Sequence, residues 1–211
     1  MEPNGRVIVV AGEAVEPAVN DRCVLTVVLR ITREHAADAI DELAALASKV
    51  VSVLHERGFE QHQIATRAVT VQDWYDQQGQ RVTGQQATYT LAIDIPSLDE
   101  VGSVLQQLSA TARNALQVQS VALTSSDTDG PRAIARANAV ADAEARAGQL
   151  AEAAGVRLGA LLSIEEGAVP WTRPFPAGEA TRMTAASAPV PIEGGTHDVT
   201  VRVTLTFAIA D

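Results

Sequence analysis

The chain has one cysteine and few histidines among its 211 residues. Cys23 alone cannot form an internal disulfide or a cysteine-rich metal site. The histidines, His35, His55, His62 and His197, are too scattered for the closely spaced ligands of a metal centre. The glycines form no phosphate-binding loop either. The sequence therefore predicts no metal and no cofactor.

Aromatic residues make up 3 % of the sequence, and 16 Lys and Arg are outnumbered by 26 Asp and Glu, for a formal net charge of -10. An acidic chain repels a phosphate backbone, and few aromatic side chains are present to stack on bases. We therefore expect no nucleic-acid partner.

Long apolar runs are also missing, and none approaches the roughly 18 residues that span a bilayer. The N-terminus, MEPNGRVIVVAGEAVEP, holds a five-residue apolar stretch, which is shorter than the apolar segment of a secretory signal. As the sequence stands, it predicts a cytoplasmic protein without an integral membrane segment. The alternative is a periplasmic or cell-surface protein whose signal peptide has been removed.

What is present is an ordinary globular composition, with 46 % hydrophobic and 20 % charged residues. A folded chain of this size buries about 70 % of its extended surface, so a core can form without disulfides. We predict a single domain over residues 1–211. Its sub-regions are 22–124 and 129–211, and residues 1–21 should pair with one of them.

Residues 22–124 switch several times between an apolar period of two and one of about 3.6. The pattern predicts, in order, a strand at 22–31, a helix from Thr32 to Gly58, strands at 64–75 and 82–95, a helix from Ser97 to about 112 and a strand at 118–124. This order is that of the split β-α-β, ferredoxin-like unit.

The chain is therefore predicted to be an α+β protein with an antiparallel sheet. Strands 22–31 and 82–95 should be adjacent and central, with both helices on one face. The first helix should bury one apolar stripe: Ala36, Ile40, Leu43, Ala47, Val50 and Leu54. The other sheet face, with Val24 and Val28, then needs a cover from the C-terminal strands or a partner subunit.

The remaining segments should extend this core by a third helix and a C-terminal β-hairpin with a long loop. A strand at 7–11 should end at Gly12, and an alanine-rich helix should be capped by Asp129 and end at Gly155. Its helical wheel places Glu144 within a face of small residues, so that the stem of Glu144 should pack at the edge and its carboxylate should reach water or an arginine. The face is formed by Ala133, Ala137, Val140, Ala141, Ala147, Gly148 and Ala151. A strand at 156–165 should have Val156, Leu158, Leu162 and Ile164 on one face, and the last strand should span 197–210.

Residues 166–196 contain five of the nine prolines and four of the 14 glycines. This loop is far longer than a compact domain usually contains without a use for it. Its large apolar residues are Trp171, Phe175 and Met183. We predict that this arm contacts a neighbouring subunit through these residues; the alternative is a disordered tether.

No residues form a recognisable catalytic group. Cys23 shares the apolar face of its strand with Leu25, Val27 and Leu29, which indicates a packed, inert thiol. Asp142 and Arg146 form an i, i+4 pair typical of a solvated helix face. No serine or cysteine lies in a nucleophile turn. The sequence therefore predicts a protein that is not an enzyme.

Several short motifs recur in a known family. They include Val-Ala-Gly-Glu at 10–13, GFEQHQIAT at 58–66 and Ser-Asp at 126–127. A longer series follows: Asp142-Ala143, Arg146-Ala147, Leu150-Ala151, Ala154-Gly155, Leu158-Gly159, Ile164-Glu165, then Pro189-Val190-Pro191-Ile192 and Gly194-Gly195. In order and spacing, this set resembles the bacterial SIMPL-domain family over nearly the whole chain.

The resemblance implies an α+β protein that is oligomeric, and ring- or channel-like, in at least some members. It links the chain loosely to oxidative stress, to the cell surface or, in animals, to kinase signalling, and it supplies no catalytic residues. The leading interpretation is a non-enzymatic assembly or binding protein that forms a homo-oligomer, with its protein partner unknown. Two alternatives stay open: a small-molecule or stress-ligand binding protein that uses the 166–196 loop, and an unrecognised enzyme.

Overall fold

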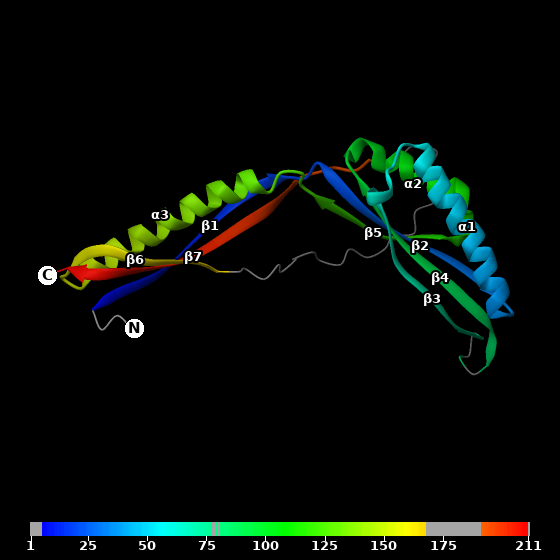
Figure 1. Ribbon diagram of the computed structural model, residues 1–211, viewed down its shortest axis with the longest axis horizontal. Coiled ribbons are helices and arrows are strands. Elements are labelled where there is room, and N and C mark those ends of the chain that lie inside the picture. The colour runs from blue at the N-terminus through cyan, green and yellow to red at the C-terminus, as the bar shows by residue number, and fades with distance from the viewer. Residues whose placement is uncertain (1–5, 77–78, 80, 168–190, 211) are drawn as a thin grey trace. The chain divides into compact units, whose positions relative to one another are not determined.

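The computed structural model describes residues 6–76, 79, 81–167 and 191–210 (Figure 1). Three helices and seven strands in this part form two compact units. The central unit comprises 20–126 and 191–195, and the terminal unit comprises 6–19, 127–167 and 196–210. The α+β class is confirmed; that the whole chain is one domain stays a prediction.

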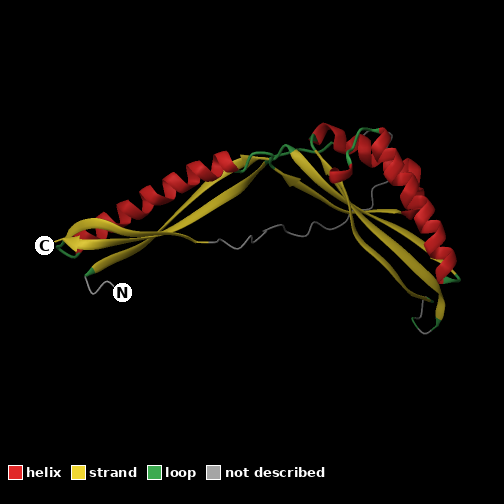
Figure 2. Ribbon diagram, viewed as in Figure 1, coloured by secondary structure: helices red, strands yellow, loops and turns green. Residues whose placement is uncertain are grey.

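The central unit is a four-stranded antiparallel sheet with two helices on one face (Figures 1 and 2). The sheet order is β3-β4-β2-β5. The elements are β2 (Arg22–Arg33), α1 (Ala36–Glu56), β3 (Ile64–Tyr75), β4 (Val82–Ile95), α2 (Leu98–Ala112) and β5 (Leu116–Thr124). The split β-α-β arrangement is confirmed, with β2 and β4 adjacent and central.

The core of the central unit lies between the helices and one face of β2 and β4. Leu25 and Leu29 of β2, with Leu91 and Ile93 of β4, are fully buried there. The opposite face, here called the open face, is covered by neither helix. By register it carries Val24 and Val28 as predicted, although Val28 is itself only 5 % exposed.

Two details of α1 differ from the sequence prediction. Thr32 does not begin the helix, because β2 continues to Arg33 and the Thr32 hydroxyl accepts a hydrogen bond from Gln86 of β4. Ile40 is not in the core but 46 % exposed, and Ala39 is buried in its place. The end of the helix is as predicted, since Gly58 takes a positive φ that glycine adopts without strain.

The terminal unit is a three-stranded antiparallel sheet in the order β1-β7-β6, covered on one face by α3 (Figure 1). Its elements are β1 (Val7–Val19), α3 (Asp129–Ala153), β6 (Arg157–Gly167) and β7 (Thr196–Ala210). Asp129 does not cap the helix as predicted, because Thr128 occupies the N-cap position. The carboxylate of Asp127 accepts a hydrogen bond from the backbone N–H of Gly130.

The prediction that the first strand ends at Gly12 is wrong. A Cβ atom at Gly12 would lie 2.0 Å from the carbonyl oxygen of Ala139 and 2.7 Å from the Cβ of Ala143. Gly12 is therefore the point where α3 approaches the strand too closely for any side chain, and β1 continues seven residues beyond it.

The face of α3 that meets the sheet was also predicted wrongly. The buried residues recur every four positions: Ala135, Ala139, Ala143, Ala147 and Ala151. Ala147 and Ala151 belong to the predicted face, whereas Ala133 and Ala137 are exposed. Glu144 points away from the sheet and is exposed. In a helix where most residues are small, the apolar contrast that identifies a face is weak.

Strand β6 does not keep the single apolar face predicted for it. Its register to β7 shifts on both sides of Leu161, so Leu161 rather than Leu162 lies opposite the buried Phe207. Leu162 and Ile164 are 51 % and 56 % exposed. Bulges of this kind break the alternation on which a sequence pattern depends.

Candidate functional site

No catalytic or metal centre stands out in the described part of the chain, where no three His, Cys, Asp or Glu side chains gather to hold an ion. His55 Nδ1 lies 2.9 Å from the carbonyl oxygen of Phe59, and His62 Nδ1 lies 3.2 Å from the Glu60 carboxylate. These are local contacts. Among the described residues, no helix is long and apolar enough to cross a bilayer.

Cys23 is fully buried in β2, as its strand neighbours predict. Burial raises the pKa of its thiol to about 11, and the negative charge of Asp94 adds to the shift. Because the thiolate is the reactive form of cysteine, this environment disfavours reaction.

Thiol reagents should therefore modify the native protein at pH 8 at least about 100-fold more slowly than the urea-unfolded chain. A thiol pKa of about 11 rather than 9.0 lowers the thiolate fraction about 100-fold, before any effect of access. The measurement is the labelling rate followed by mass spectrometry. Native labelling within about threefold of the unfolded rate would show that Cys23 is reactive and a candidate redox sensor.

An apolar groove of about 570 Å³ runs between α1 and β3 in the central unit. Apolar residues of both elements line it: Ile40, Leu43, Ala47, Val51, Val69 and Val71. The ring of Tyr89 also lines it, and its hydroxyl is 2.6 Å from the Thr66 hydroxyl. We call this the α1–β3 groove. Val69 and Val71 face the helix side of the sheet by register, yet they are 60 % and 40 % exposed.

The outer edge of β3 adjoins this groove and, among the described residues, pairs with no strand. Nearly all of β3 is exposed, and Trp74 and Tyr75 at its end are each about half exposed. Arg67 and Asp73 are the charged residues of the 12-residue strand. A long edge with few charges presents backbone N–H and C=O groups to any extended segment that reaches it.

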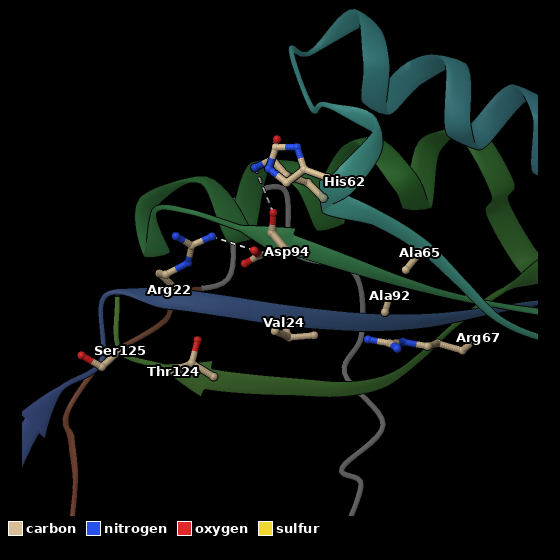
Figure 3. Close-up of a pocket in the computed structure, with 10 residues that line it drawn as sticks. Arg22, Val24, His62, Ala65, Arg67, Ala92, Asp94, Thr124 and Ser125 are labelled. Carbon is tan, nitrogen blue, oxygen red and sulfur yellow. Dashed lines mark hydrogen bonds and ion pairs between the residues drawn. The ribbon is translucent and has the colours of Figure 1, made fainter. Parts of the chain in front are cut away.

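A second depression, of about 320 Å³, lies on the open face of the central sheet (Figure 3). Its lining includes Arg22, Val24, Ala65, Arg67, Ala92 and Asp94. We call it the open-face hollow. Arg22 Nη2 lies 2.6 Å from Asp94 Oδ2, and His62, Gln63 and Thr124 complete much of the rim. The motif GFEQHQIAT at 58–66 contains His62, Gln63 and Ala65 of this lining, but the sequence alone indicated no hollow there. The residues of the groove belong to no motif.

The predicted contact residues of the arm, Trp171, Phe175 and Met183, lie outside the described residues. Their role in a subunit contact therefore stays a prediction. The described chain resumes at Pro191, and Ile192 packs against the core of the central unit. The 166–196 loop is thus anchored to that core at its C-terminal end.

One protein family matches nearly the whole length of the chain. The family model called SIMPL, a protein of unknown function (DUF541), matches residues 8–207. The chain belongs to the SIMPL family. The resemblance drawn from short motifs is therefore confirmed, and no function comes with it because the SIMPL family has none assigned.

Curated relatives match most of the length of this SIMPL chain. A 26 kDa periplasmic immunogenic protein from Brucella melitensis is 29 % identical over 215 residues, covering 96 % of this chain and 84 % of the relative. The protein of the same name from Brucella abortus (strain S19) has the same identity and coverage. An uncharacterized protein YggE from Edwardsiella ictaluri is 27 % identical, covering 88 % of this chain and 80 % of the relative.

The motif residues of the SIMPL signature on α3 contact the free edge of β1. The Asp142 carboxylate accepts from the N–H of Glu13 at 3.0 Å, and the Arg146 guanidinium donates to the carbonyl oxygen of Ala11 at 3.1 Å. Asp142 and Arg146 also pair with each other at 2.9 Å. They are more than the solvated pair that the sequence indicated, because they occupy the edge groups of β1. The outer edge of β3 has no such cover within the described chain.

Proposed function

We propose that this SIMPL protein is a non-enzymatic protein that self-associates through the α1–β3 groove and the adjoining edge of β3. The observation that carries the proposal is the exposure of Val69 and Val71 on the helix-facing side of β3, whose outer edge pairs with no strand among the described residues. Contiguous exposed apolar side chains beside a free strand edge mark interaction surfaces in soluble proteins.

The geometry suits an extended segment as the occupant. An added strand would gain backbone hydrogen bonds from β3, and alternate side chains of that strand would enter the groove. Burial of Val51, Val69 and Ile40 would supply the apolar contribution. Asp142 and Arg146 occupy the edge groups of β1 at Glu13 and Ala11, so an incoming strand does not have the same access there.

The occupant we propose is a second copy of the chain, inserted through its 166–196 arm. This arm holds Trp171 and Phe175 in a chain with few aromatic residues, and Met183 as a further large apolar side chain. Tryptophan is among the residue types that contribute most to interfaces, and prolines lower the entropy lost when a segment is ordered. Apolar anchors on the arm match the apolar lining of the groove.

We also propose that the protein acts in the periplasm, in place of the cytoplasm that the sequence alone suggested. Two relatives that cover most of this chain are named periplasmic proteins. None of the relatives described above carries an enzyme name, which supports a binding or assembly role over catalysis.

Replacing Val69 with glutamate should weaken self-association at least about tenfold, because a charge would then be buried in an apolar groove. The measurement is solution mass by light scattering across a concentration series. The matched control is Thr70→Glu, which places the same charge on the next residue of β3 but on the opposite face. We expect wild type and Thr70→Glu to form the same oligomer.

Deletion of residues 169–189 tests the occupant separately. If the arm fills the groove, this variant should be a folded monomer at concentrations where wild type is oligomeric, and Val69→Glu should shift toward the same mass. An unchanged oligomer with unchanged stability would leave the arm without an assembly role. A wild type that is monomeric at about 100 μM, where contacts of micromolar affinity are occupied, would contradict the proposal as a whole.

A further inference from the structure

We infer that the open-face hollow binds a small organic monocarboxylate, with its carboxylate on Arg67 and its apolar stem on the sheet. The hollow and the α1–β3 groove lie on opposite faces of β3 and β4. Ala65 and Ala92 are register partners on the open face, whereas Val69 and Tyr89 are partners on the helix face. The inference is therefore independent of the proposed self-association.

Small side chains form the floor of the hollow. Ala92 of β4 pairs directly with Ala65 of β3. Val24 of β2 is the diagonal neighbour of Ala92, because Val24 pairs with Asp94 and Ala92 pairs with Thr26. Longer side chains surround this floor (Figure 3). The result is an apolar patch below a polar rim, which is the composition of a small-molecule site. Its volume of about 320 Å³ suits a small ligand.

Arg67 supplies a charge that no described residue neutralises. Figure 3 shows its guanidinium extending over the sheet toward Val24 and Ala92. It makes no hydrogen bond or ion pair within the described chain, although the protein has 26 acidic residues. A guanidinium presents two parallel N–H donors that match the two oxygens of a carboxylate. Its position over an apolar floor favours an anion that carries a carbon stem.

Arg22 and Asp94 form the opposite side of the hollow and limit the charge of the ligand. Asp94 Oδ2 accepts from Arg22 Nη2 at 2.6 Å, and the Asp94 backbone carbonyl accepts from Gln63 Nε2 at 3.3 Å. This pair is internally balanced. With Arg67 added, the hollow has a formal charge of +1 when His62 is neutral. The Asp94 carboxylate would repel a dianion such as phosphate, so a monoanion fits better.

The test is an NMR titration of the full chain with sodium butyrate, at constant ionic strength against sodium chloride. We expect saturable shifts in the amides around Val24, Ala65 and Ala92, with a dissociation constant of about 1 mM for so small a ligand. Acetate, which has two fewer methylene groups, should bind at least about fivefold more weakly because it lacks the stem that contacts the floor.

Arg67→Gln should weaken butyrate binding at least about tenfold, because the charge-assisted pair is lost. The matched control is Arg30→Gln, which removes an arginine from the same sheet face outside the hollow and should change affinity less than about twofold. Four results would overturn the inference: no saturable shift up to about 20 mM, equal losses in both variants, equal binding of acetate, or displacement of butyrate by equimolar phosphate. Self-association of Arg67→Gln, measured alongside, should match wild type.

Discussion

Replacing Gly12 with alanine is expected to destabilise the terminal unit by about 3 kcal/mol or more. The new Cβ would lie 2.0 Å from the backbone oxygen of Ala139, and a backbone atom cannot rotate away as a side chain can. The helix must therefore move off the sheet. That movement opens the contacts of Ala139 and Ala143, both of which are fully buried.

Hydrogen exchange of the full chain measures this effect segment by segment. Peptides from β1, α3 and β7 should lose protection in Gly12→Ala, while peptides from the central unit should not. The matched control is Gly148→Ala on α3, where an added Cβ meets no atom within 4 Å. That change should be neutral or stabilise by up to about 1 kcal/mol, since alanine favours a helix. Similar behaviour of the two variants would rule out the close approach at Gly12.

The second large effect is expected from Leu29→Ala in the central unit. Leu29 is fully buried on β2, the strand between β4 and β5, so its truncation leaves a cavity below α1 and α2. Truncations of this kind cost about 2 to 5 kcal/mol. Denaturant unfolding combined with hydrogen exchange should show the loss in β2, β4 and α1.

Leu162→Ala is the control for Leu29→Ala, because it removes the same atoms from a side chain that is about half exposed on β6. Its expected cost is below about 1 kcal/mol. The two units have separate apolar cores, so Leu29→Ala and Gly12→Ala should each act on a different set of peptides. Loss of protection throughout the chain in either variant would show that the units unfold together.

The sequence predicts the central unit well because its elements differ sharply in period. Strand β4 alternates between apolar and polar residues, and β3 and β4 have the bounds that the pattern indicates. Glycine at Gly58 marks the end of α1 by its backbone conformation. Where local propensity and burial agree in this way, a sequence pattern is sufficient to give the order of elements and hence the sheet topology.

The terminal unit is predicted less well, because its packing depends on close approach rather than on apolar contrast. A sequence cannot show whether a glycine such as Gly12 ends a strand or lies where a helix packs closely on that strand. In the structure, the close approach of Ala139 shows that Gly12 has the second role. Alanine at every second position from 133 to 147 leaves the buried face of α3 undefined in the sequence. The register shifts around Leu161 likewise cannot be recognised from the alternation of apolar and polar residues in the sequence.

The sequence could not predict the groove or the hollow, because each exists where no other element covers the side chains of the sheet. Ile40 and Val69 have the spacing of core residues, and they are exposed because β3 is an edge strand beside α1. Arg67 belongs to no motif, and it lies where the register of β3 to β4 shifts between Thr66 and Ala68, so an alternating pattern does not place it beside the hollow. A weak signal was present, since Val69 and Val71 are apolar on a strand with no second apolar face.

The contacts that Asp142 and Arg146 make with β1 also bear on amyloid formation. Residues 7–11 are Val, Ile, Val, Val and Ala, a run with high β propensity and no charge, which is the composition of a cross-β nucleus. The carbonyl oxygen of Ala11, at the end of this run, is held by Arg146. Pro17 lies four residues after Glu13 in the same strand, so its backbone nitrogen faces the same outer edge of β1. Because proline has no N–H, it offers no donor to a neighbouring strand there. The family signature on α3 thus occupies the edge of this strand at Ala11 and Glu13, which hinders the addition of a further strand at those two residues.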